Sequence, residues 1–338
     1  MGNQTQFLLD SGFWGWLYKL LYPVEWLMTQ IMSLFHKFLV MLGMNPVGFS
    51  WVMSIVFLVL VVQACIFPLF YKTMKSMRKM QEIQPKMMRI QNKYKNKTDQ
   101  ASKEAMQREM MKLYQDNDAN PMGSCLPMLI QGPVFMCMFY TLSAIPYIAR
   151  GTFRNGGTLG AFDIPTAKEF TSTTVFGVNV ADNFTTAAVH GKVVIAIFVA
   201  LMCFCLWFMQ YNSMKRNMAQ SAANKQTEMM QKMMLWMFPI MYIFSGVAMP
   251  FAVLVYWLTN NICNLLRSIW QIRFFPTPGS PAAEDKEKRD HKRENERRAK
   301  AGLPSLEEEE LEKARKAAES REKNGYQRHQ PSRKKKKK

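Results

Sequence analysis

The chain contains few of the residues from which metal centres and catalytic sites are built. Only four histidines occur in 338 residues, and they are far apart. The six cysteines all lie in or at the edge of apolar runs, as small buried apolar residues do. The predicted membrane spans contain no HExxH motif and no Ser/His or Asp/Asp pair, and the chain has no glycine-rich phosphate-binding loop. The sequence therefore predicts a protein that is not an enzyme and needs no cofactor or metal.

Apolar and charged residues are segregated along the chain. Apolar residues make up 49% of the sequence, yet the mean hydropathy is −0.14 and the formal net charge is +19. Residues 13–275 hold the long apolar runs, and residues 277–338 hold almost none. This pattern indicates a membrane protein with a soluble tail. Residues 1–12 have no basic stretch, so we expect no cleavable signal peptide.

Five apolar segments are predicted to cross the membrane as helices, since a crossing needs about 20 apolar residues. The stretch 234–270 is too long for one crossing. Pro250 favours a break near 246–250, because proline cannot donate a backbone hydrogen bond. The predicted spans within the membrane core, residues 51–275, are 51–71, 125–148, 193–211, 234–249 and 251–270. We find no Asp, Glu, Lys or Arg in the interior of these spans.

The N-terminal segment, residues 1–50, contains an ambiguous apolar stretch at 24–42. Its polar residues recur at helical spacing and form a stripe: Glu25, Thr29, Gln30, Ser33, His36 and Lys37. A stripe of this kind favours a helix that lies in the membrane interface. A sixth span is the alternative.

Basic residues indicate which segments are cytoplasmic. Segment 72–120 carries 12 Lys and Arg against 6 Asp and Glu, whereas segment 145–191 carries 3 against 3. Because basic loops stay in the cytoplasm, we expect 72–120, 212–233 and the tail 276–338 inside and 145–191 outside.

Residues 72–120 are predicted to form a cytoplasmic antiparallel hairpin of two helices, 72–95 and 100–116. The hairpin is rich in methionine, which is flexible and packs against varied apolar partners. Its methionines either fill the seam between the two helices or contact a protein partner; the candidates are Met77, Met80, Met87, Met106 and Met110. The basic residues between them are expected to meet anionic lipids or ribosomal RNA.

The tail is strongly charged. Residues 284–323 are nearly all Glu, Lys, Arg and Ala, which indicates a solvated segment that is partly helical or disordered. The chain ends in a basic run of six residues: Arg333, Lys334, Lys335, Lys336, Lys337 and Lys338. Such a run is predicted to bind a polyanion, either RNA or an anionic lipid surface, and a solvated terminus is the alternative.

Three motifs resemble those of a known family. They are Pro68-Leu69 followed by KTMKSMRKMQEIQPK at 72–86, Asn120-Pro121 followed by CLPMLIQGPVF at 125–135, and Pro250 followed by LVYWLTNN at 254–261. In order and topology, residues 13–275 resemble the YidC/Oxa/Alb family of membrane protein insertases, in the short form without a large periplasmic domain.

The resemblance implies an all-α, polytopic protein of the bacterial plasma membrane, with a five-helix core bundle. A polar groove open to the cytoplasm and to lipid would insert membrane proteins, here called clients, and help them fold. The implied partners are nascent clients, the ribosome through the basic tail, and anionic lipids, with a Sec-type translocon as a further candidate.

Five polar residues in the predicted spans are candidates for lining this groove. They are Gln63, Gln131, Thr259, Asn260 and Asn261. The resemblance implies an arginine in the first core span where this chain has Gln63, so the charge that would attract an acidic client is missing there. An interhelical hydrogen bond is the alternative role of Gln63. A hydrated groove predicts that Gln63→Arg is tolerated.

A small-solute transporter or channel is the alternative function. Many transporters contain inverted repeats and charged residues within their spans. The sequence shows neither feature, and insertion of client proteins is therefore the preferred hypothesis.

Overall fold

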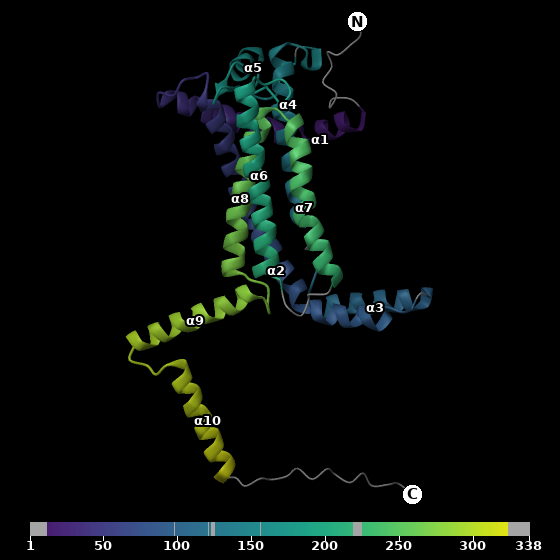
Figure 1. Ribbon diagram of the computed structural model, residues 1–338, viewed down its shortest axis with the longest axis vertical. Coiled ribbons are helices and arrows are strands. Elements are labelled where there is room, and N and C mark those ends of the chain that lie inside the picture. The colour runs from purple at the N-terminus through teal and green to yellow at the C-terminus, as the bar shows by residue number, and fades with distance from the viewer. Residues whose placement is uncertain are drawn as a thin grey trace. The chain divides into compact units, whose positions relative to one another are not determined.

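The computed structural model describes residues 12–97, 99–120, 122, 126–155, 157–218 and 225–323, most of them helical (Figure 1). The chain separates into two units, Met1–Ala282 and Ala283–Lys338, and each is described by itself. The first unit contains the helices α1 (Gly12–Met41), α2 (Phe49–Tyr94), α3 (Gln100–Asp116), α4 (Leu126–Ala149), α5 (Ile164–Thr171), α6 (Val189–Arg216), α7 (Lys225–Ala248) and α8 (Phe251–Phe274), and the short 3-10 helix η3 (Phe153–Asn155). The helical content and the apolar helices confirm the predicted all-α polytopic membrane fold.

Helix α2 combines a membrane span with the first arm of the hairpin. Its 46 residues continue through Pro68 and Pro85 without a break. At 1.5 Å per residue the helix is roughly 69 Å long, more than twice the thickness of a hydrocarbon core of about 30 Å. The apolar first half and the basic second half therefore lie in different surroundings, and the hairpin is a direct continuation of the span.

Three helices in the described ranges are long and apolar enough to cross a membrane, namely α2, α4 and α6. Helix α8 falls outside this group because it carries a polar series from Thr259 to Arg267. The crossings at 234–249 and 251–270 therefore stay predictions. The chain leaves helical structure at Met249 and Pro250, between α7 and α8, which is the region where the sequence predicts a break.

The two ends of the bundle differ. At one end, called the hairpin end, α2 extends to meet α3; at the other, called the cap end, lies α5 (Figure 1). The short strands β1 (Thr174–Val175) and β2 (Val178–Asn179) pair there in antiparallel register. Beside them, the backbone carbonyl of Asp182 accepts a hydrogen bond from the N–H of Phe251 at 2.7 Å. This contact satisfies one of the otherwise unpaired first N–H groups of α8.

Helix α3 packs antiparallel against the extension of α2. Three lysines of α2 at seven-residue spacing reach across to it: Lys79 donates to the carbonyl of Asp118, Lys86 to Oδ1 of Asn117, and Lys93 pairs with Glu109 at 2.5 Å. A spacing of seven residues returns to nearly the same helix face after two turns. Pairing with Lys93 lowers the pKa of Glu109 and raises that of Lys93.

Four of the six residues in the predicted polar stripe of α1 point into the protein, whereas Gln30 is half-buried and Lys37 is exposed. Glu25 and Thr29 are fully buried, and Ser33 and His36 are 6% exposed. The outward face is apolar instead. The structure places these four residues on one face, but the expectation for an interfacial helix is that its polar face meets water. The physical reason for the difference is the cap, which supplies polar partners for Thr29 and for Nε2 of His36.

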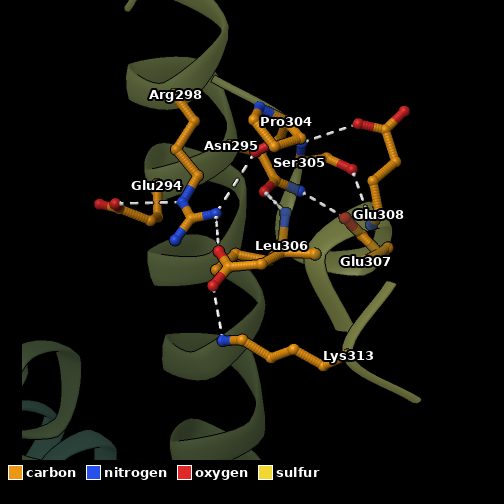
Figure 2. Close-up of polar contacts among 10 residues, drawn as sticks. Glu294, Asn295, Arg298, Pro304, Ser305, Leu306, Glu307, Glu308 and Lys313 are labelled. Carbon is orange, nitrogen blue, oxygen red and sulfur yellow. Dashed lines mark hydrogen bonds and ion pairs between the residues drawn. The ribbon is translucent and has the colours of Figure 1, made fainter. Parts of the chain in front are cut away.

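The second unit contains most of α9 (Pro281–Lys300) together with α10 (Leu306–Lys323), joined by a corner of polar contacts (Figure 2). Ser305 and Glu308 bond to each other's backbone N–H, as in a capping box. Arg298 of α9 and Lys313 of α10 both pair with Glu309. These two cations hold the pKa of Glu309 down at about 2. The basic run 333–338 lies outside the described residues.

Candidate functional site

Three side chains from two helices form a hydrogen-bonded network inside the bundle. Gln63 on α2 donates from Nε2 to Oδ1 of Asn260 on α8 at 2.5 Å. The Oε1 atom of Gln63 accepts a hydrogen bond from Nη1 of Arg267 at 3.2 Å. Asn260 and Arg267 are seven residues apart on α8 and so lie on one face. Gln63 therefore links two polar positions of α8 across the helix interface.

Gln131 extends the network to a third helix, α4. Its Nε2 atom donates to the same Oδ1 of Asn260 at 3.4 Å. Its Oε1 atom is buried and has no hydrogen-bond partner among the described residues. Buried polar atoms are normally paired, often through water. A cavity of about 10 Å³ beside the network, lined by Gln63, Asn260 and Tyr256 but not by Gln131, has room for about one water molecule.

Arg267 is the cation of this network. Its guanidinium carbon lies 3.6 Å from the centre of the Phe70 ring, and Nη2 donates to Oδ1 of Asn264 at 2.6 Å. Among the described residues, no carboxylate forms an ion pair with it. A cation removed from water without an opposite charge costs free energy, which the ring contact and the two hydrogen bonds offset only in part. The site keeps a net positive charge.

Arg267 lines a half-open cavity of about 300 Å³ at the hairpin end. Residues of α2, α6 and α8 form its walls, together with Pro127 of α4. The polar residues in the lining are Thr73, Gln81, Gln210, Ser213, Asn217, Asn264, Arg267, Ser268 and Gln271. None of the described residues that line it is acidic, and Arg267 is the one charged residue among them, so this part of the cavity is polar and positively charged.

The cap end of the bundle is closed by packed side chains. Trp51 and Ile55 of α2, Ile145 of α4, and Phe251 and Leu254 of α8 are all fully buried. Polar groups transferred into such a core lose their hydrogen bonds to water. The bundle is therefore accessible to polar groups from the hairpin end and closed at the cap end.

The structure brings together three of the five predicted groove residues, namely Gln63, Gln131 and Asn260. Thr259 instead donates its hydroxyl to the carbonyl of Val255 in its own helix, at 2.8 Å. Asn261 is buried on α8 and belongs to neither the network nor the lining of the 300 Å³ cavity. The groove roles of all five residues stay predictions.

The sequence analysis missed Arg267. The statement that no charged residue lies inside the predicted spans is wrong, because Arg267 falls within 251–270 and its side chain is turned into the bundle. A charge so close to the end of a span is typical of an anchor at the membrane surface. The spacing of Asn260, Asn264 and Arg267, at intervals of four and three residues, was the available signal, since it places all three on one helix face.

The methionines of the hairpin have two different positions. Met77 lines the 300 Å³ cavity. Met80 and Met87 on α2, which are seven residues apart, and Met106 and Met110 on α3, which are four apart, are half-buried, and these spacings place each pair on one helix face. The structure thus favours packing for these four, and the proposed contact with clients is untested.

Residues 42–277 match the family model described as the 60Kd inner membrane protein. The chain is 74% identical over 337 residues to the membrane protein insertase YidC of Bifidobacterium longum, which covers 99% of this chain and 100% of that protein. It is 34% identical over 292 residues to the membrane protein insertase YidC of Tropheryma whipplei strain Twist, covering 82% and 92%. A crystal structure of an active YidC insertase with its first transmembrane domain resolved aligns with a TM-score of 0.42 at 21% identity, covering 75% and 47%.

The family match extends over most of the chain, and the Bifidobacterium relative matches nearly its full length. The resemblance inferred from the motifs is confirmed. The chain belongs to the YidC/Oxa/Alb family of membrane protein insertases and is a multi-pass inner-membrane protein.

Proposed function

We propose that this protein inserts other membrane proteins into the bilayer and helps them fold, and that it receives them in the 300 Å³ cavity at the hairpin end. The names of the relatives support insertion. The observation that carries the mechanism is the asymmetry of the bundle: a polar, positively charged cavity at one end and a packed core at the other.

The cavity reduces the work of moving a polar segment into the membrane. Each unsatisfied backbone polar group in hydrocarbon costs several kcal/mol. Amides and hydroxyls of the lining, such as those of Gln210, Ser213 and Gln271, offer replacement hydrogen bonds over part of the path. Apolar segments of the client then move sideways into lipid, which drives insertion without a nucleotide. This is transfer between environments, and no bond in the client is made or broken.

Arg267 gives the cavity its preference among clients. A carboxylate that enters meets a guanidinium that has no acidic partner in the described chain. Hydrogen bonds to charged groups contribute about 1.5–3 kcal/mol each. The family resemblance implies an arginine on the first core span. In this proposal the positive charge comes instead from Arg267 of α8, next to Gln63.

The hairpin end faces the cytoplasm and the cap end faces outward in this proposal. The positive-inside rule supports it, since segment 72–120 carries 12 basic against 6 acidic residues. The tail, which is basic overall, lies on the same side. In this orientation the cavity opens toward newly made chains. A membrane-impermeant thiol reagent should fail to label Gln100→Cys in intact cells.

Three further partners follow from charge. The basic run 333–338 suits ribosomal RNA, and the basic surface of the hairpin suits anionic lipid headgroups. A Sec-type translocon is a further partner that would receive or supply clients. A solute transporter, the alternative function, has no support among the relatives named above.

The test is insertion of a client with a polar translocated tail into vesicles that contain the purified protein. Asn264→Leu with Ser268→Leu makes the cavity apolar, and we expect insertion to fall at least about tenfold, the equivalent of 1.4 kcal/mol. Leu266→Met, on the exposed face of the same helix, is the matched control and should insert normally. Normal insertion by the folded double variant would contradict the proposal.

A further inference from the structure

Arg267 lies near the end of α8, where an arginine ordinarily extends to the membrane surface. It is seven residues before Phe274, the last residue of the helix, which is roughly 10 Å along the helix axis. The long stem of an arginine at such a position allows the guanidinium to reach water and headgroups. The guanidinium of Arg267 is turned inward instead, because Nη1 donates to Oε1 of Gln63 at 3.2 Å. The inward position needs contacts that compete with water.

Phe70 of α2 provides one such contact. The guanidinium carbon of Arg267 lies over the Phe70 ring, 3.6 Å from its centre. The Phe70 side chain is only 6% exposed, and withdrawal from water strengthens the attraction between a cation and the face of a ring. The two hydrogen bonds of the guanidinium end on the uncharged amides of Gln63 and Asn264. The ring therefore offers an electrostatic attraction that neither amide matches with a full charge.

The packing of α2 against α8 brings Phe70 and Arg267 to the same level. Gln63 and Asn260 are hydrogen-bonded across this interface at 2.5 Å. Both helices begin at the cap end, and Phe70 and Arg267 each lie seven residues beyond that bonded pair. Seven residues are about two turns, so both side chains return to the shared interface at a similar depth. The ring is thus placed beside the cation by the register of the two helices.

Two aromatic pairs stabilise this register on either side of Phe70. Phe67 packs against Trp270 with ring centres 5.5 Å apart, and Tyr71 packs against Phe275 at 5.7 Å. Among the described contacts, the ring of Phe70 is the one that lies beneath this guanidinium. The alignment of the helices and the contact with the cation therefore involve different rings, which can be altered separately.

We infer that Phe70 is a positioning residue, which holds the guanidinium of Arg267 inside the cavity next to Gln63, so that the preference for acidic clients depends on this ring. The inference rests on the proposed function, in which Arg267 receives the carboxylates of clients. Without the ring, the guanidinium is freer to turn toward water at the hairpin end. The net charge of the protein is then unchanged, but the charge no longer lies where a translocated carboxylate passes.

Exchanges at two neighbouring rings test the inference in the full-length protein reconstituted into vesicles. Phe70→Leu and Phe70→Met remove the ring and keep an apolar side chain, whereas Phe70→Tyr keeps the ring. Phe67→Leu is the matched control, since it removes a ring of α2 that contacts Trp270 and not the cation. The first readout is the ratio of insertion between a client with two Asp residues in its translocated tail and the same client with two Asn residues.

The strength of a cation–π contact corresponds to a change of roughly three- to thirtyfold in this ratio. We expect a fall of that size in Phe70→Leu and Phe70→Met, and a ratio close to that of the wild type in Phe70→Tyr and Phe67→Leu. An equal fall in Phe67→Leu would overturn the inference, because looser packing of α2 against α8 would then explain the loss.

The second readout follows Arg267 in the absence of clients. Phenylglyoxal modifies accessible guanidinium groups, and mass spectrometry of the digested protein gives the rate at this residue. We expect faster modification in Phe70→Leu and Phe70→Met, and an unchanged rate in Phe70→Tyr and Phe67→Leu. An unchanged rate in ringless variants that melt like the wild type would overturn the inference.

Arg267→Gln separates this inference from the proposed function. If Arg267→Gln lowers the client ratio and folded Phe70→Leu does not, the positioning role of Phe70 is wrong. If Arg267→Gln leaves the ratio unchanged, client selection by Arg267 is wrong, and so is the dependence of that selection on Phe70; the rate of modification still decides whether the ring holds the guanidinium in place.

Discussion

The exchange Gln63→Glu tests the electrostatic role of the network with almost no change in shape. Oε1 of Gln63 already accepts a hydrogen bond from Nη1 of Arg267 at 3.2 Å. The exchange puts a carboxylate at that position and neutralises the local charge. The contact also changes the expectation for Gln63→Arg. The expectation that Gln63→Arg is tolerated assumed that residue 63 has uncharged neighbours. In the structure, the new guanidinium would lie beside that of Arg267.

The magnitudes can be worked from the contact. Two unit charges about 4 Å apart attract by about 4 kcal/mol at an effective dielectric constant near 20, and desolvation of the new carboxylate offsets several kcal/mol of that. We therefore expect the melting temperature of Gln63→Glu to stay close to that of the wild type. An acidic client, however, loses a charge-assisted contact of about 1.5–3 kcal/mol. At 1.4 kcal/mol per factor of ten, its insertion should fall roughly ten- to a hundredfold.

The assay compares paired clients whose translocated tails carry either two Asp or two Asn residues. Gln63→Glu and Arg267→Gln should both reduce insertion of the Asp client and leave the Asn client unchanged. The double variant leaves a buried carboxylate without a partner and should be destabilised by about 3–5 kcal/mol. Equal insertion of both clients by folded Gln63→Glu protein would refute the assignment of client charge selection to Arg267.

Three further outcomes are expected. Gly160→Ala should destabilise the protein, because a Cβ at Gly160 would overlap the hydroxyl of Thr29. Gly43→Ala is the control: residue 43 also has a left-handed backbone but nothing within 4 Å of a Cβ, so this exchange should cost only about 1 kcal/mol. Equal melting temperatures of the two variants would contradict the close approach of Gly160 to Thr29. The Arg298–Glu309 ion pair should persist as the pH falls to about 5 and should weaken only between pH 4.5, the ordinary carboxyl pKa, and about pH 2, because the folded state lowers the pKa of Glu309. The measurement is the helicity of the isolated tail as a function of pH. A loss of helicity already above pH 5 would contradict this prediction. Deletion of residues 331–338 should weaken cosedimentation with ribosomes in a salt-dependent way, and unchanged binding at low salt would exclude an RNA role for the run.

Span length and helical periodicity were sufficient to predict the helical membrane fold. The length of the stretch 234–270 and the presence of Pro250 indicate two helices, and the structure has a break at that proline. The 46-residue length of α2 was less evident, because Pro85 normally ends or kinks a helix. The packing of α3 along the extension of α2 accompanies the continuous helix there, through contacts such as Lys86 to Asn117.

The site was predictable only in part, because periodicity gives a face and not the neighbour of that face. Gln63, Asn260 and Gln131 were identified as polar residues in apolar spans, and the structure joins them. The position of Arg267 next to Gln63 depends on how α8 packs against α2, a contact between residues about two hundred positions apart. The polar stripe of α1 shows the same limit, since its spacing is equally compatible with water and with the cap.

The most direct measurement is crosslinking between the cavity and a client in transit. A photoreactive amino acid at Gln271 lies in the lining of the cavity, and one at Leu266 lies on the exposed face of the same helix. A ribosome-bound client, stalled as its polar segment enters the membrane, should crosslink to position 271 and much less to position 266. Crosslinks from 266 with none from 271 would show that clients pass along the outside of the bundle and would contradict insertion through this cavity.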